Sequence, residues 1–198
     1  TKGYLEKLIA QVFTRRERFE PGNPQEGYSP SPQERQSWLQ ISYMKEAYHT
    51  MGPKFTLGWM AEALYSSKNF SENYTATMMQ AGEFAPTPHS KLMYNEAFRA
   101  NQYVAAGIKP IYVLNDMFQF RTEFYGFTPI FPIKKNALNK AYYGKAFSRF
   151  EYMGEVSVIC HLPFGAISAY VNHYSSPRRE WNVGMTIGWQ LFNYRFVE

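Results

Sequence analysis

Hydrophobic and polar positions alternate without interruption along residues 181–191. One parity carries only apolar side chains, and the other carries Asn, Gly, Thr and Gln. Because successive side chains of a β-strand point to opposite faces, this pattern predicts a strand with one apolar face. Its two tryptophans are separated by about 26 Å of strand, and aromatic girdles border the apolar band of membrane barrels. We therefore expect these side chains to face lipid: Trp181, Val183, Met185, Ile187, Trp189 and Leu191.

The same alternation recurs through most of the chain. It predicts strands at 37–48, 55–65, 104–114, 118–125, 143–162 and 166–174, with a weaker strand at 73–83. Short turns alternate with longer connections, as in a membrane barrel with one short-turn rim. The strands number about nine, whereas single-chain bacterial barrels have even numbers. We therefore expect an all-β fold, an antiparallel transmembrane β-barrel of which this chain is an incomplete, C-terminal part.

The chain divides into an N-terminal segment, 1–34, and a barrel portion, 35–198. Apolar residues within 4–18 follow helical spacing and arginines crowd the end of that stretch, which favours a short helix. An imperfect strand is the alternative. Residues 20–34 contain four prolines and two glycines, which predicts a loop. The chain starts without Met or an apolar signal core, so we expect a processed or partial chain.

Composition supports a membrane location. Aromatic residues make up 18% of the chain and charged residues 19%, and aromatic rings suit the interface between lipid and water. No run of 18 apolar residues occurs, which excludes a transmembrane helix. The net charge is +5, but Lys and Arg are scattered, which argues against nucleic acid as a partner.

Catalytic and metal-binding patterns are missing from the sequence. Residues 165–169 do not match the Gly-x-Ser-x-Gly nucleophile motif. The single cysteine, Cys160, excludes a disulfide framework, and its neighbour His161 points to the opposite face of a strand. The four histidines show no metal spacing. We expect no cofactor, no metal and no enzymatic activity from these residues, including no hydrolysis of lipid esters.

Charged residues of the predicted strands lie on the parity opposite the apolar one: Lys109, Arg121, Glu123, Lys145, Arg149 and Glu151. A charge on the lipid face of a barrel costs about 2–4 kcal/mol at midplane, so we expect these side chains in the lumen. They form either an ordinary mixed-charge lumen or a binding site for Arg99 of the long loop 84–101. In the second case Arg99 lies near Glu123. The alternative partners of Glu123 are Arg121 and Arg149.

Several motifs resemble those of the BamA-like bacterial surface-antigen barrels. Residues 161–168, followed by a strand, a short loop and 181–192, resemble the terminal hairpin of that superfamily. Residues 121–129 resemble its Glu-x-Arg-Phe-Pro strand motif, without the Arg. The segment 98–101 lies where the family's lumen loop carries Val-Arg-Gly-Phe, and shares only the Arg. The resemblance implies a transmembrane barrel with the 84–101 loop inside it.

A narrower resemblance covers residues 73–198. The segments 73–77, 84–90, 95–102 and 172–176 are similar to the C-terminal barrel of patatin-like phospholipases of Bacteroidota. This implies the bacterial outer membrane and a barrel segment that anchors or displays an upstream lipase domain, whose Ser-Asp pair is absent here. The implied partners are outer-membrane lipid, the remainder of the barrel, the upstream domain, and either a homodimer or a larger membrane complex. Two alternatives are a translocation or assembly pore and a soluble β-sandwich binding module.

Overall fold

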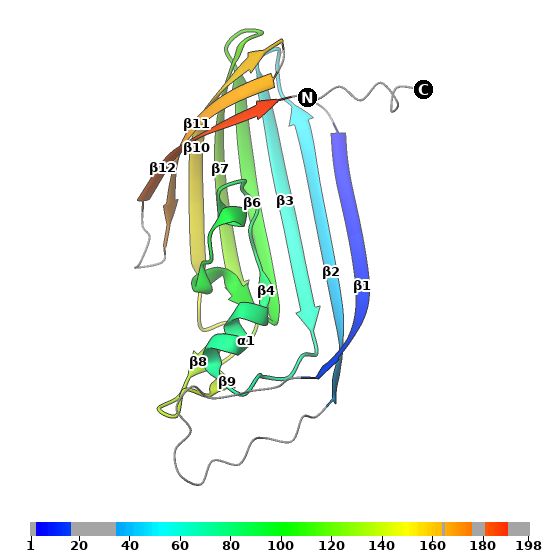
Figure 1. Cartoon of the computed structure of the whole chain (residues 1–198). Helices are drawn as coiled ribbons and strands as arrows, with labels where there is room; N and C mark the ends of the chain where they lie inside the picture. Colours follow the sequence, from blue (N-terminus) through cyan, green and yellow to red (C-terminus); the bar gives the residue numbers. More distant parts are fainter. Residues whose placement is uncertain (1–2, 17–34, 164, 176–180, 190–198) are drawn as a thin grey trace.

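A computed structural model describes residues 3–16, 35–163, 165–175 and 181–189. One curved antiparallel sheet of eight strands dominates it, and each strand pairs with the next long strand along the chain (Figure 1). In sheet order the strands are β1 (Gly3–Arg16), β2 (Arg35–Thr50), β3 (Phe55–Ser66), β6 (Gln102–Val113), β7 (Phe118–Pro129), β10 (Glu151–Leu162), β11 (Gly165–Tyr174) and β12 (Trp181–Trp189).

Shorter elements lie in two of the connections. Between β3 and β6 come α1 (Tyr74–Gln80), β4 (Gly82–Glu83), the 3-10 turns η1 (Ser90–Leu92) and η2 (Glu96–Phe98), and β5 (Arg99–Ala100). Between β7 and β10 come β8 (Ile133–Lys135) and β9 (Ala141–Tyr143). The strands β4 and β5 form one small ribbon, and β8 and β9 form another.

The expected all-β, antiparallel fold class is confirmed. The described residues place eight strands in the large sheet instead of about nine. The helix expected within 4–18 is wrong, because β1 pairs with β2 from Gly3 to Arg16, and this ladder overrides the local helical spacing. The first strand therefore belongs to the same sheet as the portion from residue 35, and the expected division at residue 34 does not separate it.

Two expected strands have different boundaries or a different structure. Residues 74–80 form α1, not a strand, and the Asn73 side chain accepts a hydrogen bond of 2.8 Å from the Ala76 amide as the N-cap. The long strand expected from Tyr143 begins only at Glu151. Residues 144–150 belong to the connection before β10.

The connections differ in length at the two ends of the sheet. The residues between strands number two to four at 51–54, 114–117 and 163–164, whereas the connections 67–101 and 130–150 are far longer. Because neighbouring strands run antiparallel, the short connections share one rim of the sheet, and β1 begins and β12 ends at that same rim. We call this the short-turn rim and the opposite one the long-loop rim.

The long connection 67–101, which we call the inner segment, packs on one face of the sheet (Figure 1). Its Phe84 and Phe98 are each 1% exposed, and they share one apolar cluster with sheet residues such as Tyr103, Phe127 and Tyr174. The sequence predicts 84–101 inside a barrel, and the structure shows it packed on the face of the sheet that carries the polar parity. We call that face of the sheet the inner face and the opposite one the outer face.

Glycines let aromatic rings lie flat against neighbouring strands. Gly58 pairs with Tyr48 across β2 and β3, and a Cβ atom on Gly58 would lie 2.6 Å from the Tyr48 ring. Gly107 pairs in the same way with Tyr125 across β6 and β7, where a Cβ atom would also lie 2.7 Å from the Phe124 carbonyl oxygen. Only a residue without a side chain leaves room for such a ring at these positions.

Candidate functional site

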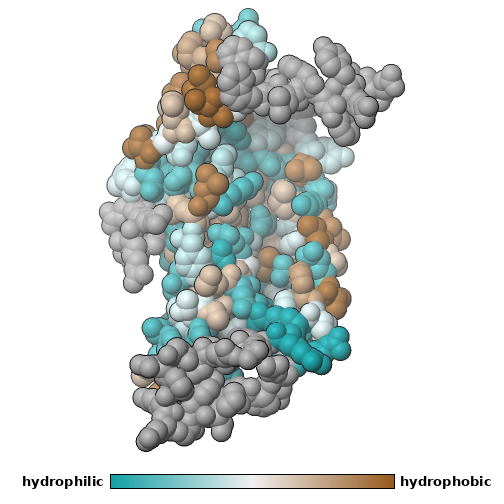
Figure 2. All heavy atoms as spheres, in the orientation of Figure 1, coloured by the Kyte–Doolittle hydropathy of each residue, from teal (hydrophilic) through white to brown (hydrophobic). Residues whose placement is uncertain are grey.

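From β3 to β12 the outer face of the sheet is apolar and exposed, whereas on β1 and β2 it carries the Glu6–Lys45 ion pair. From β3 to β12, the described residues on that face include no Asp, Glu, Lys or Arg. Exposed apolar side chains recur on it from strand to strand, for example Ile108 at 50%, Phe124 at 55% and Val171 at 41%. Figure 2 views the molecule from the side of the inner segment, where hydrophilic residues gather, with hydrophobic ones mainly along the margins. An exposed apolar surface of this extent indicates an interaction surface.

The last strand follows the predicted parity. The structure places Trp181, Val183, Met185 and Ile187 on the outer face, and the most exposed of them, Val183, is 79% exposed. Their cross-strand neighbours on β11 include Ala169 and Ile167, which lie on the same face. The Trp189 side chain and Leu191, the two other residues of this prediction, lie outside the described part of the structure.

The inner face carries two partly buried ion pairs that span four strands. Lys109 on β6 pairs with Glu46 on β2, and Arg121 lies 2.5 Å from Glu123 within β7. Lys109 is 5% and Glu123 4% exposed. Each carboxylate also accepts a hydrogen bond from a phenol two residues further along its strand. These phenols belong to Tyr48 and Tyr125. Buried charges need such partners, so this network holds the inner face in one arrangement.

The predicted pair between Arg99 and Glu123 is wrong. The Arg99 guanidinium donates to Glu83 at 2.6 Å and to the Met79 and Ala81 carbonyls at 3.1 and 3.3 Å. Glu83 lies opposite Arg99 in the β4–β5 ribbon, so the local pairing supplies the carboxylate. Glu123 is neutralised by Arg121, which was the alternative.

The remaining predicted charges lie near the long-loop rim. Arg149 donates to the Ala97 carbonyl at 2.7 Å and lies 3.6 Å from Glu151, which in turn accepts from Ser175. Arg149 thereby ties the connection before β10 to the inner segment. Lys145, expected on a strand face, lies in that connection and is exposed. The predicted lumen cluster is therefore several separate pairs.

Sequence reasoning missed the acidic partners. Glu46 and Glu83 complete two of the ion pairs. Glu46 lies on the polar parity of its strand, together with Gln40 and Ser42, and this parity was the signal that could have identified it. No comparable signal marked Glu83, because its strand is two residues long.

Further polar contacts attach the inner segment to the sheet. The Tyr103 hydroxyl donates to Glu62 at 2.6 Å and to the Glu83 carbonyl at 3.1 Å. His89 lies 3.0 Å from the Tyr174 hydroxyl. Within the segment, the Tyr74 hydroxyl donates a hydrogen bond to Glu96. Burial is the larger cause and this hydrogen bond the second cause that raise the pKa of the Tyr74 phenol. The phenol therefore stays protonated and remains a donor.

In the described ranges, no group of three or more His, Cys, Asp or Glu side chains could hold a metal ion. His161 contacts Gln119 at 3.3 Å on the inner face, whereas the adjacent Cys160 points to the outer one. None of the helices described is long and apolar enough to cross a membrane.

Comparisons with known proteins identify no relative. No protein family, curated protein or solved structure matches the chain.

Proposed function

We propose that the sheet is part of an outer-membrane β-barrel that anchors or displays an upstream patatin-like lipase domain. The outer face carries this proposal, because from β3 to β12 its described residues are free of Asp, Glu, Lys and Arg. The partly buried ion pairs lie on the inner face. A charge facing lipid costs about 2–4 kcal/mol near midplane, so this separation is what a bilayer requires.

Strand dimensions agree with the proposal. The strands β3, β6, β7 and β10 each have 12 residues, and a tilted strand needs about 9–11 to cross the apolar layer. One rim has short turns and the other long connections, as in outer-membrane barrels, where the short turns are periplasmic. By this rule the inner segment enters from the outer side of the membrane.

Barrel closure needs further strands. In the described sheet β1 and β12 each pair on one side only. Unpaired strand edges are not tolerated in lipid, because their backbone groups have no water to bind. We propose that the remainder of the barrel, or a second copy of the chain, pairs with both edges.

The lipase part of the proposal rests on the sequence resemblance alone. The inner segment covers the inner face of β6, β7 and β11, which favours an anchor over an open pore. In this proposal any hydrolysis belongs to the upstream domain, because the sequence carries no Gly-x-Ser-x-Gly nucleophile motif.

Thiol labelling in membranes tests the barrel. In a Cys160→Ala background, single cysteines replace Val183 and Ile187 on the outer face and Thr186 on the inner face. In membranes from cells that produce the protein, a water-soluble maleimide should label position 186 strongly and the other two weakly. All three should label equally in urea. Strong labelling at 183 and 187 with protection at 186 would refute the proposal.

A further inference from the structure

The connection between β7 and β10, residues 130–150, has a strong excess of positive charge. It contains four lysines and one arginine and no acidic residue. The inner segment, in contrast, has three basic and three acidic residues. All four lysines are exposed, and none of them forms an ion pair with a described acidic residue. They are Lys134, Lys135, Lys140 and Lys145. Among the described residues, the connection 130–150 therefore carries lysine charges without an ion-pair partner.

The connection is ordered by its own hydrogen bonds and still exposes aromatic rings. The amide of Gly144 donates to the Pro132 carbonyl at 2.8 Å, and that of Phe147 donates to the Ile130 carbonyl at 2.9 Å. Phe147 has φ of 51°, a left-handed conformation that is unfavourable for a bulky side chain. Phe147 is nevertheless 62% exposed and Phe150 65% exposed. The same connection thus exposes two apolar rings as well as its lysines.

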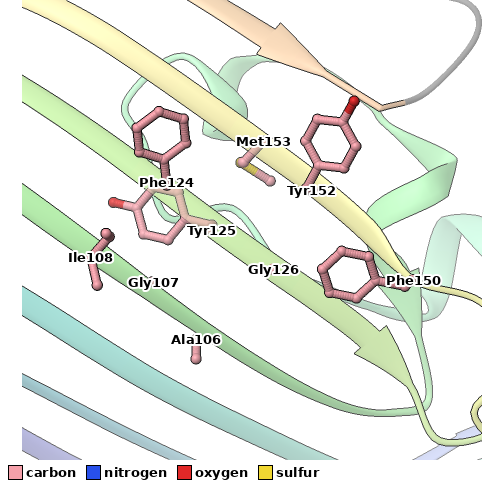
Figure 3. Close-up of a pocket in the computed structure, with 9 residues that line it drawn as sticks. All are labelled: Ala106, Gly107, Ile108, Phe124, Tyr125, Gly126, Phe150, Tyr152 and Met153. Carbon is pink, nitrogen blue, oxygen red and sulfur yellow. The ribbon is translucent and has the colours of Figure 1, made fainter.

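The same connection ends at an apolar groove on the outer face (Figure 3). The groove has a volume of about 480 Å³ and is lined by the rings of Phe124, Phe150 and Tyr152, with the Phe150 ring packed over Gly126. A second hollow of about 320 Å³ continues past Gly154 and shares Phe124 and Tyr152 with the first. Ligand sites of several hundred Å³ that are lined by aromatic side chains suit apolar ligands.

We infer that the groove and the connection 130–150 together bind an anionic phospholipid of the surrounding membrane. An acyl chain lies in the groove past Phe150, and the lysines bind the phosphate at the long-loop rim. The inference rests on the proposed function, since the groove lies within the part of the outer face, β3 to β12, whose described residues carry no charge. Charge complementarity selects an anionic headgroup, because clustered lysines at a membrane surface attract acidic lipids. The apolar lining selects a hydrocarbon chain rather than a polar partner.

Photo-crosslinking tests this site. The protein is placed in phosphatidylcholine nanodiscs that contain a minor fraction of phosphatidylglycerol with a diazirine on one acyl chain. Cross-links should concentrate on peptides that contain Phe124 and Phe150, in excess over peptides from β3. Replacing Lys134, Lys135, Lys140 and Lys145 by Gln should lower this enrichment about tenfold, because the attraction per lysine is substantial but screened by salt. Lys54→Gln, an exposed lysine at the short-turn rim, is the control and should change nothing.

The groove is tested separately by filling it. Ala106 lines the groove and is exposed, so Ala106→Leu should remove the local cross-links. Ala63→Leu adds the same volume at an exposed outer position that lines neither hollow, and should leave them intact. Even cross-linking over the outer face, or enrichment unchanged by the lysine replacements, would overturn the inference while the proposed function stands. Absence of cross-links from the whole outer face would overturn both.

Discussion

Phe84 is the residue whose removal most directly tests how the inner segment is held. Its ring is 1% exposed and lies 5.9 Å from the Phe127 ring, 6.0 Å from that of Tyr125 and 6.2 Å from that of Tyr103. The partners lie on β6 and β7, so the ring joins the inner segment to the centre of the sheet. Phe84→Ala removes all three ring contacts and leaves a cavity.

The expected loss follows from burial. Truncation of a buried phenylalanine to alanine costs about 3–5 kcal/mol, and each 1.4 kcal/mol is a factor of ten in an equilibrium constant. If the whole loss destabilises the docked segment relative to its open state, the open state becomes more populated by roughly 10²-fold to several times 10³-fold. The β4–β5 ribbon and the Arg99–Glu83 pair should persist, because both are contacts within the inner segment and neither involves the Phe84 ring.

Hydrogen exchange measures that opening. Amides of residues 85–97, which lie outside the β4–β5 ribbon, should exchange at least roughly a hundredfold faster in the variant, while those of β7 stay protected. Leu92→Ala is the matched control, since Leu92 is in the same segment but 81% exposed. Equal exchange rates in the two variants would show that the apolar cluster does not hold the segment, and the reasoning from burial would fail.

Two further substitutions test the sheet and the ion pairs. Gly107→Ala should destabilise the fold by about 1–3 kcal/mol, because its methyl group meets the Tyr125 ring and the Phe124 carbonyl, whereas Gly52→Ala meets nothing within 4 Å. The urea midpoint of both variants measures this, and equal midpoints would contradict it. A double-mutant cycle of Arg99→Met with Glu83→Gln should give a coupling of about 1 kcal/mol, and the cycle of Arg99 with Glu123 nearly none. A larger coupling to Glu123 would restore the partner expected from the sequence.

The alternation of side chains predicted the faces of the sheet well. On β12 it separated the exposed outer residues from Asn182 and Gly184 on the inner face. It also placed Lys109 and Glu123 on the inner face, where both are buried. A period of two is a local property of an extended chain, so it is readable without knowledge of the partners.

Whether a segment forms a helix or a strand was harder to predict from the sequence where local and long-range preferences compete. The spacing of apolar residues within 4–18 fits a helix, yet pairing with β2 makes it a strand. Residues 74–80 resemble a weak strand, yet the Asn73 cap and the burial of Met78 near Ile133 favour a helical turn. Both outcomes depend on segments that are distant in sequence, which a local pattern does not contain.

The sequence by itself determined which side chains point to each face and that, from β3 to β12, the charges of the described strands avoid the outer one, because strand parity follows from backbone geometry alone. Only the tertiary structure decided which charges meet. Arg99 pairs with Glu83 because β4 and β5 form a ribbon, and Lys109 meets Glu46, 63 residues away in sequence, because β3 carries β2 and β6 on its two sides. Ion pairs form between neighbours in space, and strand order, not sequence spacing, sets those neighbours.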